Sequence, residues 1–281
     1  MTRIKSGRGQ VGRSMALLWR TTRKPTRGPK PGLTIDTVAA KAIELADAEG
    51  LPALSMRRVA EALGVAPMSL YTYVPSKAEL VDVMLDAVYG ESAADLGRVP
   101  AAPTTRGQPT WRAGLETRAR ADWALYERHP WVLQVPRARA LLGPNELAVF
   151  EASLGMVEGL GLTAREMVAV VDVIAGFVAG AATGVAQAAR APEETGLTDD
   201  EWWGSLEPML DEVWDAERFP TTTAVQAGGG FDVPDDTVPY HVRFAIDDFE
   251  FGLERLLDGI EAFVAGRATH ADPATDPAAS A

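Results

Sequence analysis

The chain has 281 residues, of which 47% are hydrophobic and 23% are charged. This content is sufficient for a hydrophobic core in one large domain, or in a small domain joined to a larger one. The absence of cysteine excludes disulfides, thiol catalysis and the usual zinc-finger ligand set, and His129, His241 and His270 lack metal-ligand spacing. We therefore expect neither a metal nor a cofactor.

The net charge of −12 is distributed unevenly along the chain. Residues 1–31 contain nine basic residues and no acidic one, whereas the remainder has 18 basic and 39 acidic residues, a net charge of −21. Because Gly, Pro, Thr and Arg dominate residues 1–31, we expect a disordered basic arm. An organelle transit peptide, or a true start at Met15, are alternative interpretations of this segment.

Residues 34–49 are predicted to form a helix that begins after Thr34 and stops at Gly50. Residues 55–77 then read as two short helices joined by a tight turn. The first has an apolar face at helical spacing, and Pro67 suits the start of the second, in which Leu70 and Val74 point inward. The first apolar face consists of Met56, Val59, Ala60 and Leu63. This arrangement is typical of a DNA-binding helix-turn-helix, although the spacing alone equally allows a plain helical hairpin.

The residues themselves favour DNA binding. Residues 54–60 (LSMRRVA), 63–65 (LGV) and 69–74 (SLYTYV), followed by Lys77, resemble the DNA-binding domain of the TetR family of transcriptional regulators. This resemblance covers about residues 33–88. A weaker resemblance, over residues 251–260 (FGLERLLDGI), is to the last helix of the tetracycline-repressor type of C-terminal domain.

The resemblance implies roles for individual residues in a complex with operator DNA. Thr34 is expected to contact phosphate, Ser55 to cap its helix near the backbone, and Arg57 to reach a base edge. The recognition helix would present Pro67, Met68, Ser69, Tyr71 and Tyr73 to bases or phosphates, and Lys77 would bind phosphate. Arg27 and Lys30, which precede the first helix, are candidates for phosphate or minor-groove contacts.

The rest of the chain is predicted to be helical, with no alternating strand pattern, so the expected fold is all-α. Capping-box sequences at Ser76, Thr163 and Thr198 each indicate a helix start, and residues 217–239 are expected to be a loop. Pro, Gly, Ala and Thr mark a linker between two domains. The predicted divisions are the arm (1–31), the helix-turn-helix domain with a connecting helix (32–96), the linker (97–109), a C-terminal ligand-binding and dimerisation domain (110–265) and a disordered tail (266–281).

Residues 167–186 form an almost continuous apolar stretch with glycines four residues apart at Gly176, Gly180 and Gly184. A membrane span is one interpretation, but Asp172 lies inside the stretch and no basic residues flank it. Close packing against another helix is the preferred alternative, and the resemblance implies a dimer-forming helix bundle. The expected homodimer interface comprises Gly176, Gly180, Gly184, Phe251, Leu256 and Phe263. No membrane partner is expected.

A set of aromatic and polar residues in the C-terminal domain has two interpretations, as the lining of a ligand pocket or as ordinary core. The candidates are Arg118, Trp123, Tyr126, His129, Trp131, Met156, Asp172, Phe177 and Gln187. The sequence contains no GxSxG and no convergent Ser, His and acid set, so no catalytic residue is proposed.

The sequence thus predicts a cytoplasmic, prokaryotic, ligand-responsive transcriptional repressor. It would bind a palindromic double-stranded DNA operator as a homodimer and be released by a small-molecule effector. The alternatives are a ligand-independent regulator or activator, or an all-α small-molecule-binding protein in which DNA binding is incidental.

Overall fold

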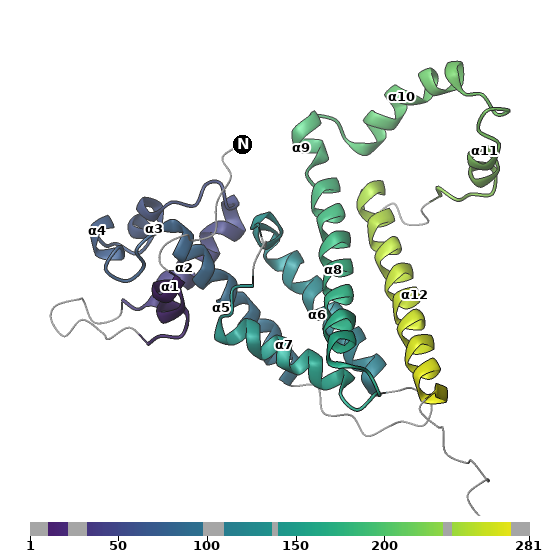
Figure 1. Cartoon of the computed structure of the whole chain (residues 1–281). Coiled ribbons are helices and arrows are strands. Elements are labelled where there is room, and N and C mark those ends of the chain that lie inside the picture. The colour runs from purple at the N-terminus through teal and green to yellow at the C-terminus, as the bar shows by residue number, and fades with distance from the viewer. Residues whose placement is uncertain (1–10, 22–32, 98–109, 137–139, 233–237, 271–281) are drawn as a thin grey trace, which may run out of the picture. The chain divides into compact units, whose positions relative to one another are not determined.

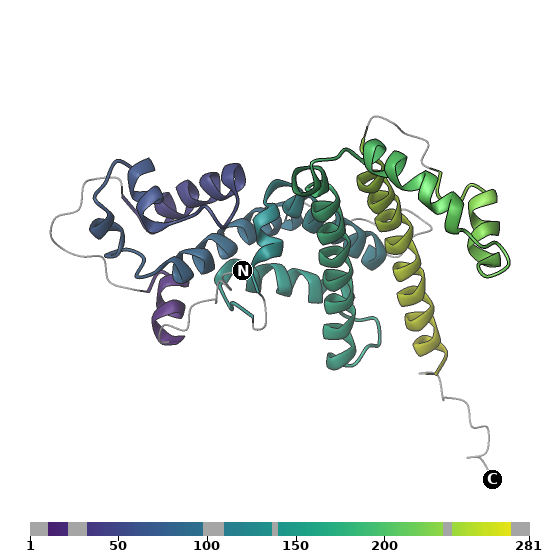
Figure 2. The ribbon, with the colours of Figure 1, turned by 90° about the horizontal axis from the view of Figure 1, so that it is seen from above.

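The computed structural model describes residues 11–21, 33–97, 110–136, 140–232 and 238–270. Within these ranges the protein consists of helices and turns with no strand, which confirms the all-α prediction (Figures 1 and 2). The α-helices are α1 (Val11–Leu18), α2 (Ile35–Glu49), α3 (Met56–Ala62), α4 (Pro67–Leu70), α5 (Lys77–Gly97), α6 (Thr110–Arg128), α7 (Pro144–Val157), α8 (Ala164–Ala188), α9 (Ala191–Thr195), α10 (Asp199–Val213), α11 (Pro220–Ala227) and α12 (Tyr240–His270). A 3-10 helix, η1, spans Pro130–Gln134.

Helices α2, α3 and α4 form the small core predicted for the helix-turn-helix. The apolar side of α3 is buried, and Leu70 of α4 and Val74 after it are fully enclosed. The buried residues of α3 are Met56, Val59 and Ala60. Gly64 has a φ of 66°, which gives the turn between α3 and α4 its sharp reversal at a residue without a side chain.

Helix α5 is the element on which the neighbouring helices converge. It packs against α2, α6 and α7, and also against α1. Its core positions include Leu80, Met84 and Val88, all with no solvent exposure. A helix contacted from several sides must bury most of its surface, and α5 accordingly buries three acidic residues as well.

The chain divides into two compact units, one of which is Gly180–Glu254. The other contains the helix-turn-helix, α6 and α7 together, because α5 packs against α2, α6 and α7 and α2 packs against α3. The predicted domain boundary at residues 97–109 stays a prediction. Residues 98–109 lie outside the described part of the chain.

Three structural expectations require correction. Residues 11–18 of the arm form α1, and Leu17 and Leu18 are buried, so this segment is not disordered. Residues 217–239 are not all loop, because Pro220 occupies the first turn of α11, where its missing N–H carries no penalty. Helix α12 continues to His270, beyond the predicted start of the tail at residue 266.

Helix α8 is long and apolar enough to cross a membrane by length and composition alone. Its most apolar window has a mean hydropathy of 2.0, and 28% of that window is buried within the protein. Asp172 and the three glycines of the predicted row are exposed. A side-chain carbon at any of these glycines would meet no atom within 4 Å.

Candidate DNA-binding surface and its supporting contacts

The first two helices of the DNA-binding head, α2 and α3, begin with the predicted side-chain caps. The Thr34 hydroxyl accepts a hydrogen bond from the Thr37 N–H at 3.1 Å, and the Thr37 hydroxyl accepts one from the Thr34 N–H at 2.8 Å. The Ser55 hydroxyl accepts a bond from the Arg58 N–H at 3.3 Å. Because caps satisfy backbone donors that a helix cannot satisfy itself, these two residues fix where α2 and α3 start.

The recognition segment presents a mixed apolar and polar face to solvent. Pro67 and Ser69 are exposed, Met68 is 75% exposed, and Tyr71 is 43% exposed. Their neighbour Leu70 is fully buried and anchors the segment. A short helix held from beneath by one leucine, with four adjacent side chains free of the core, has the geometry needed to enter a major groove.

Arg57 projects from α3 with its side chain 82% exposed. Its Nε donates to Glu61 Oε1 at 2.8 Å, one turn along the same helix. This hydrogen bond and the charge of Glu61 raise the pKa of the Arg57 guanidinium. An exposed ion pair such as Arg57–Glu61 contributes little free energy. Arg57 can therefore leave Glu61 and contact a base at small cost.

The other basic residues of the head are also engaged within the protein. Lys41 pairs with Glu44, and Arg58 pairs with Glu49. Between residues 33 and 77 there are four basic and five acidic residues. The head therefore has little uncompensated positive charge with which to attract DNA.

Lys77 is predicted to bind phosphate, and in the protein without DNA it is held by internal contacts. Its Nζ donates to the carbonyl oxygens of Leu51 and Leu54, at 3.1 and 2.5 Å, and burial lowers the pKa of the ammonium. The reason is its place at the first residue of α5, against the connection between α2 and α3. Lys77 therefore holds that connection, and its contact with phosphate stays a prediction.

Tyr73 is predicted to contact bases or phosphates, and it is less exposed than Tyr71. The recognition helix ends at Leu70, so Tyr73 lies in the following turn and not on the exposed face of a continuing helix. Its hydroxyl is buried and, among the described residues, has no hydrogen-bond partner. Tyr71 is the more accessible of the two tyrosines.

Asp47, which the sequence did not single out, joins α2 to the segment after α6. Its Oδ1 accepts a hydrogen bond from Trp131 Nε1 at 2.8 Å and lies 2.8 Å from His129 Nδ1. His129 and Trp131 are 7% and 1% exposed. These two predicted ligand residues are therefore used in attaching the DNA-binding head, because the proline after His129 ends α6 beside α2.

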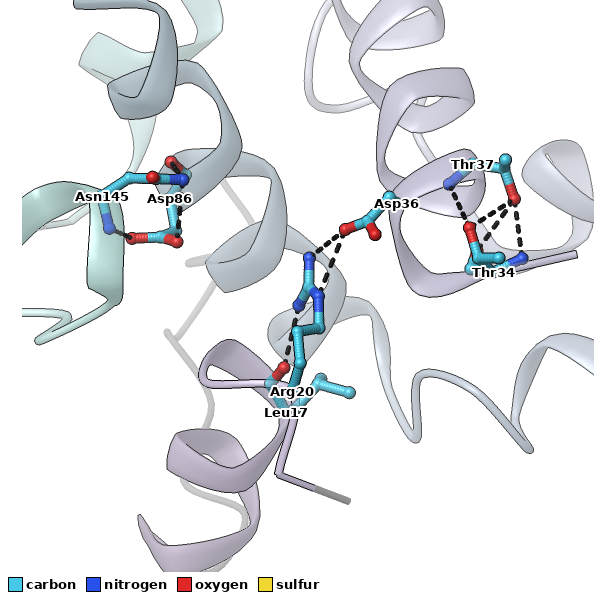
Figure 3. A network of polar contacts seen from close by, with 7 residues as sticks. All are labelled: Leu17, Arg20, Thr34, Asp36, Thr37, Asp86 and Asn145. Atoms are coloured by element: carbon cyan, nitrogen blue, oxygen red, sulfur yellow. Dashed lines mark hydrogen bonds and ion pairs between the residues drawn. The ribbon is translucent and has the colours of Figure 1, made fainter. Parts of the chain in front are cut away.

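Asp86 makes a comparable connection between α5 and α7. Its Oδ1 accepts hydrogen bonds from the N–H groups of Asn145 and Glu146, both at 3.1 Å, and so caps α7 from another helix. Figure 3 shows the contact between Asp86 and Asn145. Gly143 leaves room for this contact, since a side-chain carbon there would lie 2.1 Å from Asp86 Oδ1. Burial raises the pKa of Asp86, while the two donors act in the opposite direction.

Asp82, one turn before Asp86, is 6% exposed. Burial, together with the charge of Glu79, raises its pKa to about 6. Glu79 is itself buried. At the start of α5 the Ser76 hydroxyl accepts a hydrogen bond from the Glu79 N–H and donates one to the Glu79 carboxylate. The helix that supports the DNA-binding head thus contains a row of buried acids at Glu79, Asp82 and Asp86.

The remaining predicted ligand residues lie in different surroundings. Arg118 is buried and pairs with Asp122 at 2.7 Å, and its guanidinium also donates to Ser153. Met156 packs over Gly114 of α6. Asp172 and Gln187 are exposed, and Trp123, Tyr126 and Phe177 are partly or fully buried. The charge of Arg118 is therefore already balanced by a partner inside the protein.

The predicted dimer residues are largely accessible in the single chain. The three glycines of α8 are exposed, Phe251 and Phe263 of α12 are 65% and 43% exposed, and Leu256 is partly buried. Of the DNA-binding candidates, Arg27 and Lys30 lie outside the described residues.

Comparison with known proteins bears directly on this arrangement. A sequence model of the tetracyclin repressor-like C-terminal domain matches residues 102–264, and one of bacterial regulatory proteins of the tetR family matches residues 38–84. The chain belongs to the TetR family. Its helix-turn-helix is accordingly the DNA-binding element of a transcriptional regulator, as the sequence predicted.

Relatives of known name agree with this assignment. The HTH-type transcriptional repressor DrrR1 of Streptomyces coeruleorubidus is 44% identical over 95% of this chain and 92% of its own length. Apo ActR of Streptomyces coelicolor is 27% identical, with a TM-score of 0.61 over 86% of this chain and 100% of ActR. The complex of ActR with actinorhodin gives the same identity and TM-score over 84% and 99% of the two chains.

Proposed function

We propose that this TetR-family regulator is a cytoplasmic repressor that binds a two-fold symmetric operator as a homodimer and releases it when a small organic molecule binds. The observation that carries the DNA-binding part is the exposed segment Pro67–Tyr71 above the buried Leu70. The 44% identity to a named repressor supports repression over activation.

Homodimerisation is supported by the exposed apolar surfaces of α8 and α12. The glycine row clears one side of α8, and Phe251 and Phe263 of α12 are accessible. A second copy of the chain would bury these surfaces, and the dimer would then carry two DNA-binding heads. Two heads are needed because one recognition helix contacts only a half-site, and symmetric half-sites lie about one helical turn apart, roughly 34–36 Å.

Release by an effector follows from linkage between two binding sites. ActR is known in a complex with actinorhodin and in one with (S)-DNPA. By analogy, an organic molecule would bind among the helices that follow α5. A ligand that favours an arrangement unsuited to DNA weakens DNA binding by the coupling free energy, roughly 1.4–2.7 kcal/mol for ten- to hundredfold release.

The deciding experiment is selection of duplexes from a random DNA library by the full-length protein, followed by footprinting of the enriched sequence. We expect one motif with two inverted half-sites, and a complex that contains two copies of the chain. Actinorhodin and a panel of other organic molecules are then titrated into the complex, and loss of the footprint identifies an effector. Failure to enrich any sequence would refute the proposed function.

A further inference from the structure

The end of the basic arm is built into the protein through a segment that we call the N-terminal strap, residues 11–21. Leu17 and Leu18 are 4% and 3% exposed, and α1 packs against α5. Two adjacent leucines at the end of an eight-residue helix thus provide an apolar attachment. Such a short helix is not stable alone, so its contacts with the rest of the protein hold it in place.

Beyond α1 the strap makes one polar contact on each side. Trp19 Nε1 donates to the Leu142 carbonyl at 3.0 Å, in the segment that leads into α7. Arg20 donates from Nε at 3.2 Å to Asp36 in the first turn of α2, and from Nη1 at 2.8 Å to the Leu17 carbonyl (Figure 3). Consecutive residues of the strap therefore bind the DNA-binding head and the start of α7.

The backbone at this junction has an uncommon conformation. Among the described residues other than glycine, Arg20 and Leu142 are the ones with positive φ, at 54° and 58°. Left-handed backbone is unfavourable for residues with a side chain, so it persists where surrounding contacts impose it. Both residues lie at the Trp19–Leu142 contact.

The partner on the α7 side is itself fixed. The Leu142 N–H donates to the Glu146 carboxylate at 2.7 Å, and Asp86 holds the N–H groups of the next turn. The position of Asp36, the strap's partner on α2, is also fixed, because Thr34 caps the turn of α2 that contains Asp36. Figure 3 shows Arg20 reaching Asp36 from the strap, with Asp86 and Asn145 on the neighbouring elements.

We infer that the N-terminal strap is a positioning device that fixes the direction of the DNA-binding head relative to α7, with Trp19 and Arg20 as its positioning residues. The strap contacts α2, α5 and the segment before α7 at once, so it restricts how α2 moves against the other two. A change at the start of α7 then reaches the head through the strap as well as through α5. This role is separate from any electrostatic contribution of the basic arm.

The test measures a distance within one chain and uses neither DNA nor an effector. The protein has no cysteine, so spin labels can be placed at two chosen sites. Ala62→Cys on α3 and Glu151→Cys on α7 are suitable because both residues are exposed. Labelled protein is diluted with unlabelled protein, so that the signal comes from label pairs within one chain. Pulsed electron–electron double resonance then gives the distribution of distances between the two helices.

Five variants are compared in this background. Leu17→Ala/Leu18→Ala detaches the strap and retains every basic residue, and Trp19→Phe removes the indole donor. Arg20→Asp reverses the charge at this position, and Arg20→Asp/Asp36→Arg exchanges the two charges of the ion pair. Gly12→Ala is the matched control, because Gly12 is exposed on α1 and a side-chain carbon there meets nothing within 4 Å.

We expect a narrow distance distribution for the wild type and Gly12→Ala. The double leucine variant should give the broadest distribution, and Trp19→Phe a smaller broadening without a change in melting temperature. Combining Arg20→Asp with Asp36→Arg should restore the narrow distribution lost in Arg20→Asp alone. An unchanged distribution in the double leucine variant would overturn the inference.

A second measurement connects the strap to DNA binding. Affinity for the selected duplex should fall roughly five- to tenfold in the double leucine variant, with the slope of affinity against salt concentration unchanged. If the slope of affinity against salt concentration changed and the distance distribution did not, α1 would act on DNA binding through its charge alone and would not position the head. Because the resonance experiment needs no DNA, failure of the inference is distinguishable from failure of the proposed function.

Discussion

Arg57 of α3 and the exposed segment Pro67–Tyr71, together called the reading face, differ sharply in solvent exposure from the row of buried acids on α5. Both lie in the same compact unit. Met68 is 75% exposed and the Arg57 side chain 82% exposed, whereas Glu79, Asp82 and Asp86 are between 4% and 6% exposed. An exposed residue of the reading face makes few contacts within the protein. Its substitution should therefore change the affinity for DNA and leave the free energy of unfolding unchanged. A buried acid has contacts in the folded protein, so its substitution should change stability first.

The comparison also separates specificity from support. The reading face carries the side chains that can distinguish bases, and the residues beneath it determine where that face points. Asp47 and Asp86 attach α2 and α5 to the helices that follow, and each accepts two contacts with one carboxylate oxygen. Family members with different operators would be expected to vary the first group and retain the second.

The largest expected effect is from Gly143→Ala in the support. The backbone at Gly143 has a φ of −74°, which any residue tolerates, so the penalty is purely steric. The new carbon would displace Asp86 from the start of α7, and we expect a loss of about 2–4 kcal/mol in the free energy of unfolding from overpacking and loss of the cap.

Chemical denaturation measures this loss, and Gly155→Ala provides the control. Gly155 lies in α7, the helix that Gly143 precedes, is exposed and has nothing within 4 Å of the added carbon. Alanine there should leave stability unchanged or raise it by about 0.5–1 kcal/mol, because it favours helix. Equal stability of the two variants would show that Asp86 does not support α7.

Arg57→Ala tests the reading face. We expect affinity for the selected duplex to fall by about 5- to 150-fold with relaxed specificity at one base pair, and the free energy of unfolding to stay within error. Arg120→Ala is the matched control, since Arg120 forms the same kind of exposed pair with Glu116 on α6. Fluorescence anisotropy with matched and single-substituted duplexes gives both affinities. Wild-type affinity in Arg57→Ala would remove this residue from the reading face.

The extent to which the sequence predicted these regions depends on how far apart the interacting residues lie. The caps at Thr34, Ser76, Thr163 and Thr198 were predictable, because each joins residues three apart. The burial of Leu70 and Val74 followed in the same way from helical spacing. The exposed reading face is the complement of that buried side, so it too was accessible from the sequence.

The supporting contacts were not predictable by such reasoning. Asp47 binds groups 82 and 84 residues away, and Asp86 binds the α7 start about 60 residues away. In the sequence Asp47 is one acid on a polar helix face, with nothing to indicate its partners. The same limitation applies to Lys77 and His129, because the sequence did not predict their contacts with the Leu51 carbonyl and with Asp47.

The acid row predicts a dependence of stability on pH through Asp82. Its pKa is about 6 in the folded protein, above that of an unfolded aspartate, so the folded state holds the proton longer. Stability attributable to this group is present at low pH and is lost as the pH rises from about 4 to 6. Asp82→Asn should therefore raise the free energy of unfolding at pH 7.5 by about 1–2 kcal/mol, after the penalty of burying an amide.

Urea denaturation at pH 4.5, 6 and 7.5 measures this effect. The advantage of Asp82→Asn should grow between the lowest and the middle pH and then level off. The exposed Asp172→Asn on α8 serves as control and should show little such trend. A constant difference at all three values would mean that Asp82 titrates normally.

The smallest expected effect concerns the arm, which supplies charge that the reading face lacks. Lys41, Arg57 and Arg58 are paired with glutamates, and Lys77 is bound to carbonyl oxygens. If Arg27 and Lys30 contact phosphates, Arg27→Ala/Lys30→Ala should reduce the slope of log affinity against log salt by about 2, at about 0.9 for each lost contact. Base preference should stay the same, because phosphate contacts carry no sequence information. The slope is obtained by measuring the affinity at salt concentrations from about 50 to about 200 mM, a range in which counterion release changes the affinity strongly. A parallel shift in affinity with an unaltered slope would place these two charges away from the DNA, and the acidic head would then need another source of phosphate contacts.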